Sequence, residues 1–290
     1  MSFPSSIDDL DAAFVSFGYV PERSLTVAVH LAIQMGRPLF VEGEPGVGKT
    51  EIAKVLAAMS GGELIRLQCY EGLDASHALY EWDYARQMLA IRLLEAQGGD
   101  VEVKDIMSEE YLIARPLLKA IRRSSEGLPT VLLIDELDRA DEEFEAYLLE
   151  LLSEFQITIP EIGTIRASIP PVVVITSNRT REIHDAVKRR CIYHWIDYPN
   201  VEREIEILHK KAPDTSESLT VELAEAMRKL RELDLFKPPG VAETIDWANA
   251  LKVLGEVELS ADVIDATLGV IVKYEEDIET VRRNGLDAIV

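Results

Sequence analysis

The chain has 290 residues, which is enough for one large domain or two modest ones. Apolar residues make up 47% of it, so a substantial core can form and global disorder is excluded. Asp and Glu number 52 against 30 Lys and Arg, a net charge of −22. This balance argues against a surface devoted to duplex nucleic acid, which needs a basic face, and it suits a partner with basic patches.

The cysteines and histidines show no spacing typical of a disulfide framework or a metal site. Cys69 and Cys191 lie far apart and outside any C-x-x-C pattern, which favours a reducing cytosol. The histidines are predicted to be structural or surface residues. No apolar run reaches the length of a membrane span, and the first residues lack the features of a signal peptide. We therefore expect a cytoplasmic protein without a transmembrane segment, and peripheral association with a membrane stays compatible with this.

A phosphate-binding loop is the first motif along the chain. Two helices, over residues 7–14 and 22–35, and a short buried strand over residues 39–41 are predicted before it. Residues 43–50 then match the pattern G-x-x-x-x-G-K-[ST] at every fixed position, and a helix over residues 51–59 follows. In this context the loop N–H groups and the helix N-terminus bind phosphate. The loop residues expected to bind the nucleotide are Glu44, Pro45, Gly46, Val47, Gly48, Lys49 and Thr50.

Lys49 and Thr50 have specific expected roles in this loop. Lys49 is expected to contact the β- and γ-phosphates, and Thr50 to supply its hydroxyl to Mg²⁺. Tyr19 and Val20, in the turn between the first two helices, have two interpretations of equal weight. They either contact the adenine base or pack against the sheet.

The next stretch is predicted to be a strand followed by helices. The strand covers residues 63–69, and one helix is predicted over residues 75–97, where apolar residues recur up to a pair of glycines. Residues 100–110 are acidic and expected to be partly flexible. A further helix is predicted over residues 111–123, with a kink at Pro116.

A pair of carboxylates marks the second motif. It follows a predicted buried strand over residues 131–134, at the carboxyl end of the strand, where α/β sheets bind ligands. Asp135 is expected to hold Mg²⁺, mostly through water molecules. Glu136 is expected to polarise the water that attacks the γ-phosphate. An ordinary strand followed by an acidic turn is the alternative interpretation.

The chain after this motif is predicted to complete the sheet and then to become helical. A hairpin is expected over residues 156–167, and strands over residues 172–176 and 192–196. Asn178 follows the first of these strands, and its amide is expected to orient the attacking water. A stripe at helical spacing before the hairpin is predicted to be core, namely Phe144, Tyr147, Leu148, Leu151, Leu152 and Phe155. Residues 197–200 are the predicted domain boundary, and the helices expected after it cover residues 201–211, 221–235, 242–254 and 260–274.

The order of the phosphate loop, Asp135-Glu136, Asn178 and Arg189-Arg190 resembles the AAA+ ATPases, and most of all their MoxR branch. The match runs over most of residues 19–199. It implies an α/β P-loop NTPase fold, with a five-stranded parallel sheet between helices in a nucleotide-binding domain over residues 1–199. A smaller all-α lid domain is implied over residues 200–290. The family's helix-2 insert falls at residues 72–110, and its pre-sensor-1 hairpin at residues 155–168.

Residues 80–87 and 237–248 resemble the carbon monoxide dehydrogenase accessory ATPases of this branch. Those relatives help to mature or activate large metalloenzymes, and they typically act with a partner that carries a von Willebrand factor A domain. The resemblance implies ATP and Mg²⁺ as cofactors and a homo-oligomeric ring, with six subunits as the family expectation. It also implies an adaptor with a von Willebrand factor A domain and a metalloenzyme client.

The resemblance carries roles over to individual residues. Residues 43–50 correspond to Walker A, Asp135-Glu136 to Walker B and Asn178 to sensor 1. Arg190 matches best the arginine finger, which acts on ATP held by the neighbouring subunit, and Arg189 is the alternative. A solvated helix end is the other interpretation of this pair. Arg139 fits a second contact in trans and a surface salt bridge equally well.

The sequence departs from many MoxR relatives at the start of the third lid helix. A sensor 2 arginine stands there in those relatives, whereas residues 240–244 contain none. The lid is therefore expected to sense the γ-phosphate differently or weakly. Arg228 and Arg231 lie outside the motif and receive no role.

The leading functional hypothesis is a ring-forming ATPase that uses hydrolysis to remodel a protein client. An AAA+ nucleic-acid motor or loader is the alternative, and the acidic balance counts against it. A P-loop kinase or GTPase is the third interpretation. The chain has no guanine-reading N-K-x-D motif, and a small-molecule kinase would leave Arg190 unexplained.

Overall fold

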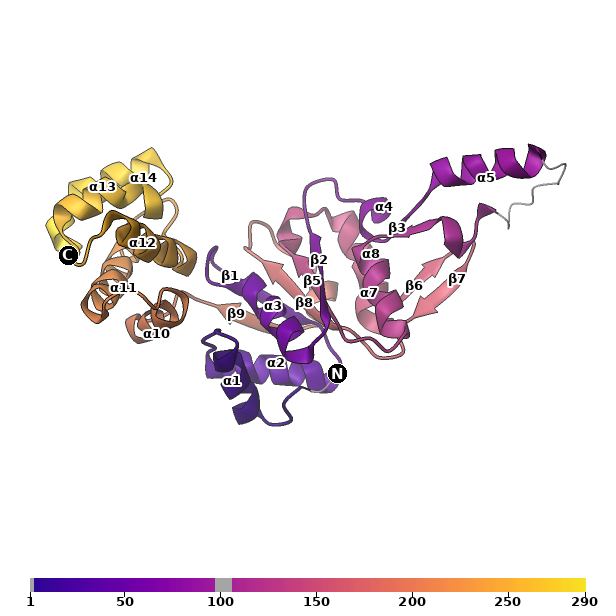
Figure 1. Cartoon of the computed structure of the whole chain (residues 1–290), viewed down its shortest axis with the longest axis horizontal. Helices are drawn as coiled ribbons and strands as arrows, with labels where there is room; N and C mark the ends of the chain where they lie inside the picture. The colour runs from indigo at the N-terminus through magenta and orange to yellow at the C-terminus, as the bar shows by residue number, and fades with distance from the viewer. Residues whose placement is uncertain (1–2, 97–105) are drawn as a thin grey trace. The chain divides into compact units, whose positions relative to one another are not determined.

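The computed structural model of the chain describes residues 3–96 and 106–290. This part of the chain forms two compact units (Figure 1). The first consists of Met1–Leu10, Ser24–Glu42 and Ile52–His194. The second consists of Asp11–Arg23, Gly43–Glu51 and Trp195–Val290, so the phosphate loop belongs to the same unit as the helical end of the chain.

A five-stranded parallel sheet forms the centre of the fold, as the sequence predicted. Its strand order is β2-β5-β8-β1-β9. The crossover connections that parallel strands require are largely helical, which is why strands and helices alternate along the sequence. The strands are β1 (Leu39–Gly43), β2 (Glu63–Gln68), β5 (Thr130–Asp135), β8 (Val172–Ser177) and β9 (Ile192–Ile196).

The register of the sheet brings the chemically important strand ends together. Gln68 at the end of β2 lies opposite Asp135 at the end of β5. Glu42 of β1 lies opposite Ser177 at the end of β8. Since β5 and β8 are also paired in parallel, the carboxyl ends of these strands meet at one edge of the sheet, where ligands bind in α/β folds.

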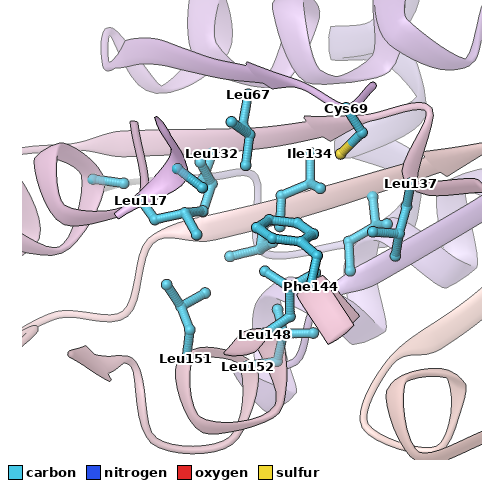
Figure 2. Close-up of a cluster of buried hydrophobic side chains, with 14 of the residues drawn as sticks. Leu67, Cys69, Leu117, Leu132, Ile134, Leu137, Phe144, Leu148, Leu151 and Leu152 are labelled. Carbon is cyan, nitrogen blue, oxygen red and sulfur yellow. The ribbon is translucent and has the colours of Figure 1, made fainter. Parts of the chain in front are cut away.

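Helices α7 (Pro116–Ser125) and α8 (Glu142–Glu154) contribute buried side chains to the main hydrophobic core, where they pack with residues of the sheet. Figure 2 shows Phe144 and Leu148 of α8 packed toward Leu132 and Ile134 of β5, with Leu67 of β2 nearby. The alternate residues of β5 are fully buried as well, which is expected for a strand covered on both faces. The other helices of this region are α1 (Ile7–Ser16), α2 (Arg23–Met35), α3 (Lys49–Ser60) and α9 (Asp185–Lys188).

The helix predicted over residues 75–97 is wrong, because a strand interrupts it. The chain instead forms α4 (Ala75–Ala78), β3 (Tyr80–Trp82) and α5 (Tyr84–Ala96), and residue 97 lies outside the described residues. Strand β3 pairs antiparallel with β4 (Leu112–Ala114). The apolar residues of this stretch are spaced as in a helix, yet three of its residues form a short strand. The partner of that strand lies about thirty residues further along the chain. Figure 1 shows α5 next to this two-stranded pair.

The helix predicted over residues 111–123 begins later than expected. Residues 109–111 form a 3₁₀ turn (Glu109–Tyr111), β4 follows, and α7 starts at Pro116. Pro116 occupies the first turn of α7, where its missing N–H costs nothing, so it begins a helix rather than kinking one. The predicted flexibility of residues 100–105 lies outside the described residues.

The hairpin predicted after α8 is confirmed as β6 (Gln156–Ile159) and β7 (Gly163–Arg166). Most of the apolar stripe of α8 is buried, but Tyr147 is 52% exposed, so its assignment to the core is wrong. Helical spacing could not separate Tyr147 from the core face, because it lies beside that face, one residue from the buried Leu148.

The end of the chain is helical, as predicted, with one helix more than expected. Trp247 lies at the centre of its core and is fully buried, and its indole N–H donates a hydrogen bond to Thr267 Oγ1 (2.8 Å). None of the helices in residues 3–96 and 106–290 is long and apolar enough to cross a membrane. The helices of this region are α10 (Val201–Lys211), α11 (Glu217–Arg231), α12 (Val241–Leu254), α13 (Ala261–Ile271) and α14 (Glu275–Asn284).

Candidate functional site

The phosphate loop leaves β1 where only glycine fits. A Cβ atom on Gly43 would lie 2.1 Å from the carbonyl oxygen of Ile196 in β9. Gly46 and Gly48 have φ values of 78° and 91°, a left-handed conformation that glycine adopts at little cost. These positions let the loop curl tightly before α3 begins at Lys49, which is the geometry of an anion-binding nest at a helix N-terminus.

The Lys49 ammonium group lies inside the loop. It is buried and donates hydrogen bonds to the carbonyl oxygens of Gly43 (2.8 Å) and Glu44 (2.6 Å). Oxygen atoms of a bound phosphate group offer the same chemistry to this ammonium, and Thr50 places a hydroxyl in the first turn of α3. The loop residues therefore fit a nucleotide phosphate.

Tyr19 and Val20 belong to the second unit, as the loop does. The Tyr19 ring is buried, and its Cε2 atom lies 3.8 Å from where a Cβ of Gly48 would be. It also packs against Phe14, with ring centroids 5.5 Å apart, and burial raises the pKa of its phenol well above its ordinary value. The Val20 carbonyl accepts a hydrogen bond from Arg203 Nη2 (3.0 Å). Tyr19 thus forms part of the wall of the loop, while Val20 is bonded to α10, and contact of either residue with a base stays a prediction.

The start of α12 packs directly on the phosphate loop. The Ala242 N–H donates a hydrogen bond to the Gly46 carbonyl (3.1 Å). A Cβ on Gly240 would lie 2.7 Å from the Pro45 carbonyl oxygen and 2.9 Å from the Gly46 Cα. This is the segment that lacks the sensor 2 arginine expected from the resemblance described above. Backbone packing connects the start of α12 to the loop at this position.

Arg231, at the end of α11, holds the segment that precedes α12. It is buried, forms a two-armed ion pair with Glu204 (2.6 and 2.8 Å) and donates to the Pro239 carbonyl (2.8 Å). Thr244 Oγ1 donates to the same Glu204 carboxylate (2.5 Å). The ends of α10, α11 and α12 are thereby fixed to one another.

Gly240→Ala is expected to weaken ATP binding about tenfold, because an added methyl group at this contact costs about 1–3 kcal/mol in overpacking. The methyl would force the start of α12 away from Pro45 and Gly46. Titration with a fluorescent ATP analogue measures the effect. Gly269→Ala is the matched control, since Gly269 lies in helix α13 with no atom near its Cβ position. Equal affinities of the two variants would contradict the role of this contact.

In the first unit, Asp135 is held by two neighbouring strands. Its carboxylate is buried, and Oδ1 accepts a hydrogen bond from Thr176 Oγ1 of β8 (2.6 Å). Oδ2 accepts from Arg66 Nε and Nη2 of β2 (2.9 and 2.6 Å). The carboxylate is fixed at the edge of the sheet, as outer-sphere binding of Mg²⁺ through water would require. Sequence reasoning missed both Thr176 and Arg66.

Glu136 has an unusual backbone conformation for a residue other than glycine. Its φ of 56° and ψ of 53° are left-handed, a conformation that costs a non-glycine residue about 1–3 kcal/mol. Its N–H donates to Thr176 Oγ1 (2.9 Å), and its carboxylate accepts from Gln68 Nε2 (3.1 Å) and Asn178 Nδ2 (3.4 Å). The carboxylate therefore lies between Gln68 at the end of β2 and Asn178, which follows β8.

A pocket of about 480 Å³ opens beside Glu136. Glu71, Asp138, Arg139 and Arg181 contribute to its walls. The side chain of Glu136 is half-buried, so water reaches it while its orientation is held by Gln68 and Asn178. A carboxylate with this access can act as a general base.

Asp138 ties the segment after β8 to the segment after β5. It is buried and accepts hydrogen bonds from the N–H groups of Asn178 (3.1 Å) and Thr180 (2.9 Å), and from Thr180 Oγ1 (2.7 Å). Arg179, between them, is left-handed with a φ of 58°. Asn178 is thereby placed beside Glu136, and its role in orienting the attacking water stays a prediction. The sequence analysis assigned no role to Asp138. Its position two residues after Glu136 could have drawn attention to it.

The carboxylates also act on Cys69, which directly follows β2. Burial and the charges of Asp135, Asp138 and Glu136 raise the pKa of the Cys69 thiol to about 12. Burial raises that of Cys191 to about 12 as well. Both cysteines are buried and free of disulfide bonds. The raised pKa favours the neutral thiol at both positions.

The paired arginines after α9 differ in their surroundings. Arg190 donates hydrogen bonds to Ser153 Oγ of α8 (2.5 Å) and to the Ala186 carbonyl (2.9 Å). The Arg189 side chain is 81% exposed, with one long ion pair to Asp185 (3.5 Å). Arg139 is exposed and forms no ion pair with another described residue. Neither member of the pair touches Glu136 or Asn178 within the described part of the chain.

Comparison with known protein families identifies a match over the part of the chain that contains these motifs. Residues 38–191 match the family described as AAA domain (dynein-related subfamily), and this is more than half of the chain. The chain belongs to that family. This AAA protein carries the phosphate loop and the acidic motif that its fold provides for nucleotide hydrolysis, and it is an ATP hydrolase.

Similar proteins include a named ATPase. The gas vesicle ATPase GvpN of Haloferax mediterranei is 24% identical over 262 residues, which cover 86% of this chain and 73% of that protein. YehL of Escherichia coli, an uncharacterised protein, is 25% identical over 308 aligned residues. The alignment covers 94% of this chain and 79% of YehL. A mutant of RuvB from Thermotoga maritima superposes with a TM-score of 0.50 at 17% identity, over 92% of this chain and 72% of that one. This last similarity concerns the fold alone.

Proposed function

We propose that this AAA ATPase works in a ring in which ATP hydrolysis remodels or activates a protein client. The observation that carries the proposal is the exposed Arg189 beside Arg190, at the end of α9. Among the described residues, neither arginine forms a hydrogen bond or ion pair with the acidic motif of its own unit, so an arginine from a neighbouring subunit would complete the site. A ring of six is the proposed assembly, with residues 1–199 as the nucleotide-binding domain and residues 200–290 as the lid.

The proposed chemistry assigns one task to each group. Glu136 takes the proton of the attacking water, Asn178 orients that water, and Lys49 contacts the phosphates. Thr50 and Asp135 would hold Mg²⁺, which supplies positive charge for the phosphate oxygens when it is bound. Thr50 offers a hydroxyl, and Asp135 offers a carboxylate already fixed by Thr176 and Arg66. This donor set of oxygen atoms suits Mg²⁺.

A protein client is proposed in preference to nucleic acid because the chain carries a net charge of −22. The resemblance of residues 80–87 and 237–248 to carbon monoxide dehydrogenase accessory ATPases supports a metalloenzyme as the client. It also supports an adaptor with a von Willebrand factor A domain. The cytoplasm is the proposed location of this ATPase. The similarity to GvpN supports the ATPase but leaves the client open.

Capture of the client with the Glu136→Gln variant, loaded with ATP, tests this function. We expect a metalloenzyme or an adaptor to be retained with ATP and lost with ADP, while Lys49→Ala retains neither. ATPase assays with duplex DNA at several salt concentrations test the alternative. Strong stimulation that fades with salt would identify a nucleic-acid motor or loader and overturn the proposed client class.

A further inference from the structure

A groove of about 750 Å³ lies in the first unit, between residues 76–84 and the hairpin formed by β6 and β7. Its walls come from α4, β3, the start of α5, one side of α8 and strand β6. Its volume falls in the range of about 300–1,000 Å³ typical of ligand pockets. No step of ATP hydrolysis uses it, since none of its lining residues belongs to the phosphate loop or the acidic motif.

One wall of the groove is the free edge of β3. The Arg115 N–H donates to the Leu79 carbonyl (3.1 Å) and the Asp83 N–H to the Tyr111 carbonyl (2.8 Å), on either side of β3. Because ladder bonds alternate along an antiparallel pair, the backbone groups of Tyr80 and Trp82 point away from β4. Both residues line the groove.

Strand β6 presents a second free edge to the same groove. The Ala167 N–H donates to the Phe155 carbonyl (2.9 Å), so the alternation directs the backbone groups of Gln156 and Thr158 away from β7. These two residues also line the groove. Among the described residues, the backbone N–H groups of Gln156 and Thr158 donate no hydrogen bond. The same holds for those of Tyr80 and Trp82 in β3. The groove is therefore bordered by two unpaired strand edges.

The side chains of the groove favour an apolar ligand with a positive charge. Tyr84 and Tyr147 line it while 64% and 52% exposed, which is unusual for rings of this size and typical of docking anchors. No Lys, Arg or His stands among its lining residues. Glu150 contributes a carboxylate that accepts hydrogen bonds from Gln156 Nε2 (3.2 Å) and Thr158 Oγ1 (3.1 Å) but forms no ion pair within the described residues.

We propose that this groove binds an extended polypeptide segment that adds a strand between β3 and β6. Main-chain hydrogen bonds to the two edges supply affinity, and the side-chain pockets supply selectivity, as in other cases of strand addition. The segment carries apolar side chains that pack on Tyr84 and Tyr147, and a lysine or arginine that pairs with Glu150. The proposal rests on the proposed function only in naming a protein client as the source of this segment.

Binding of short synthetic peptides to the full chain tests the proposal. The first peptide alternates valine and threonine around one central lysine, the second has glutamate in place of the lysine, and the third has proline at two central positions. Fluorescence anisotropy measures their affinities with and without ATP. We expect the lysine peptide to bind about tenfold more tightly than either of the others, since both the charge and the main-chain donors contribute.

Two pairs of variants separate the charge from the strand edge. Glu150→Gln is expected to remove the preference for lysine, while Glu154→Gln, on the same helix but outside the groove, keeps it. Thr158→Pro removes the N–H that faces the groove and is expected to weaken the lysine peptide about tenfold. Thr158→Val keeps that N–H and is expected to bind normally. Unchanged ATPase activity in all four variants shows that the fold is intact.

Each result decides the proposal separately from the function proposed above. Equal binding of the three peptides, or no effect of Glu150→Gln and Thr158→Pro, would overturn it even if hydrolysis and client capture proceed as expected. Lysine-selective binding would support it even if no client is captured. If the two variants instead lower the mass of the oligomer in analytical ultracentrifugation, the groove is an interface between copies of the chain, and the proposal is wrong.

Discussion

Glu136→Gln is expected to bind ATP with nearly normal affinity and to hydrolyse it about 10²–10⁴ times more slowly, the range that general bases contribute. The amide matches the carboxylate in size but cannot accept the proton of the attacking water. The left-handed backbone of Glu136 is unaffected, and the amide oxygen of the glutamine can still accept one of the two hydrogen bonds that Gln68 and Asn178 donate, which keeps the side chain near its position. Phosphate release and titration with a fluorescent ATP analogue measure the two effects.

The matched control for this variant is Glu71→Gln. Glu71 lines the same pocket as Glu136, but no hydrogen bond connects it to Asn178 within the described residues. Its loss removes the same charge from the same region and is expected to change turnover by about twofold or less, as for other exposed substitutions. Normal turnover of Glu136→Gln, or equal slowing of the two variants, would remove Glu136 as the base.

Motifs of fixed spacing could be located from the sequence because they are local. Residues 43–50 and Asp135-Glu136 each follow a short apolar strand, and both fall where the sheet places them. The strand that begins at Tyr80 could not be found in this way. Its partner, Leu112–Ala114, lies about thirty residues away, and the apolar spacing between them fits a helix equally well.

The supporting residues of the site were missed for the same reason. Arg66 and Thr176 contact Asp135 only because β2 and β8 flank β5 in a particular register. The register between these strands cannot be predicted from a single amino-acid sequence. Asp138 was closer to prediction, since it follows the acidic motif, but its partners Asn178 and Thr180 are set by tertiary structure. The left-handed backbone of Glu136 leaves no signal in a residue that is not glycine.

Arg190→Ala is expected to keep ATP binding and to lose about 10³–10⁵ in hydrolysis rate, the contribution of an arginine finger in GTPase systems. The guanidinium would have to release Ser153 and Ala186 before reaching a neighbouring subunit. Arg189 needs no such release, since it is largely exposed. Arg189→Ala is therefore the matched variant, and whichever of the two substitutions slows hydrolysis without weakening ATP binding identifies the finger.

Mixing experiments decide whether that arginine acts between subunits. Lys49→Ala is expected to lose tight ATP binding because the buried ammonium of the phosphate loop disappears, yet it keeps both arginines. In a mixed ring, an Arg190→Ala subunit supplies an intact loop and its Lys49→Ala neighbour supplies the arginine. Such an interface holds one complete site, so two inactive proteins together regain part of the activity. An arginine that serves its own chain would give no recovery at any mixing ratio, because neither subunit then contains both groups.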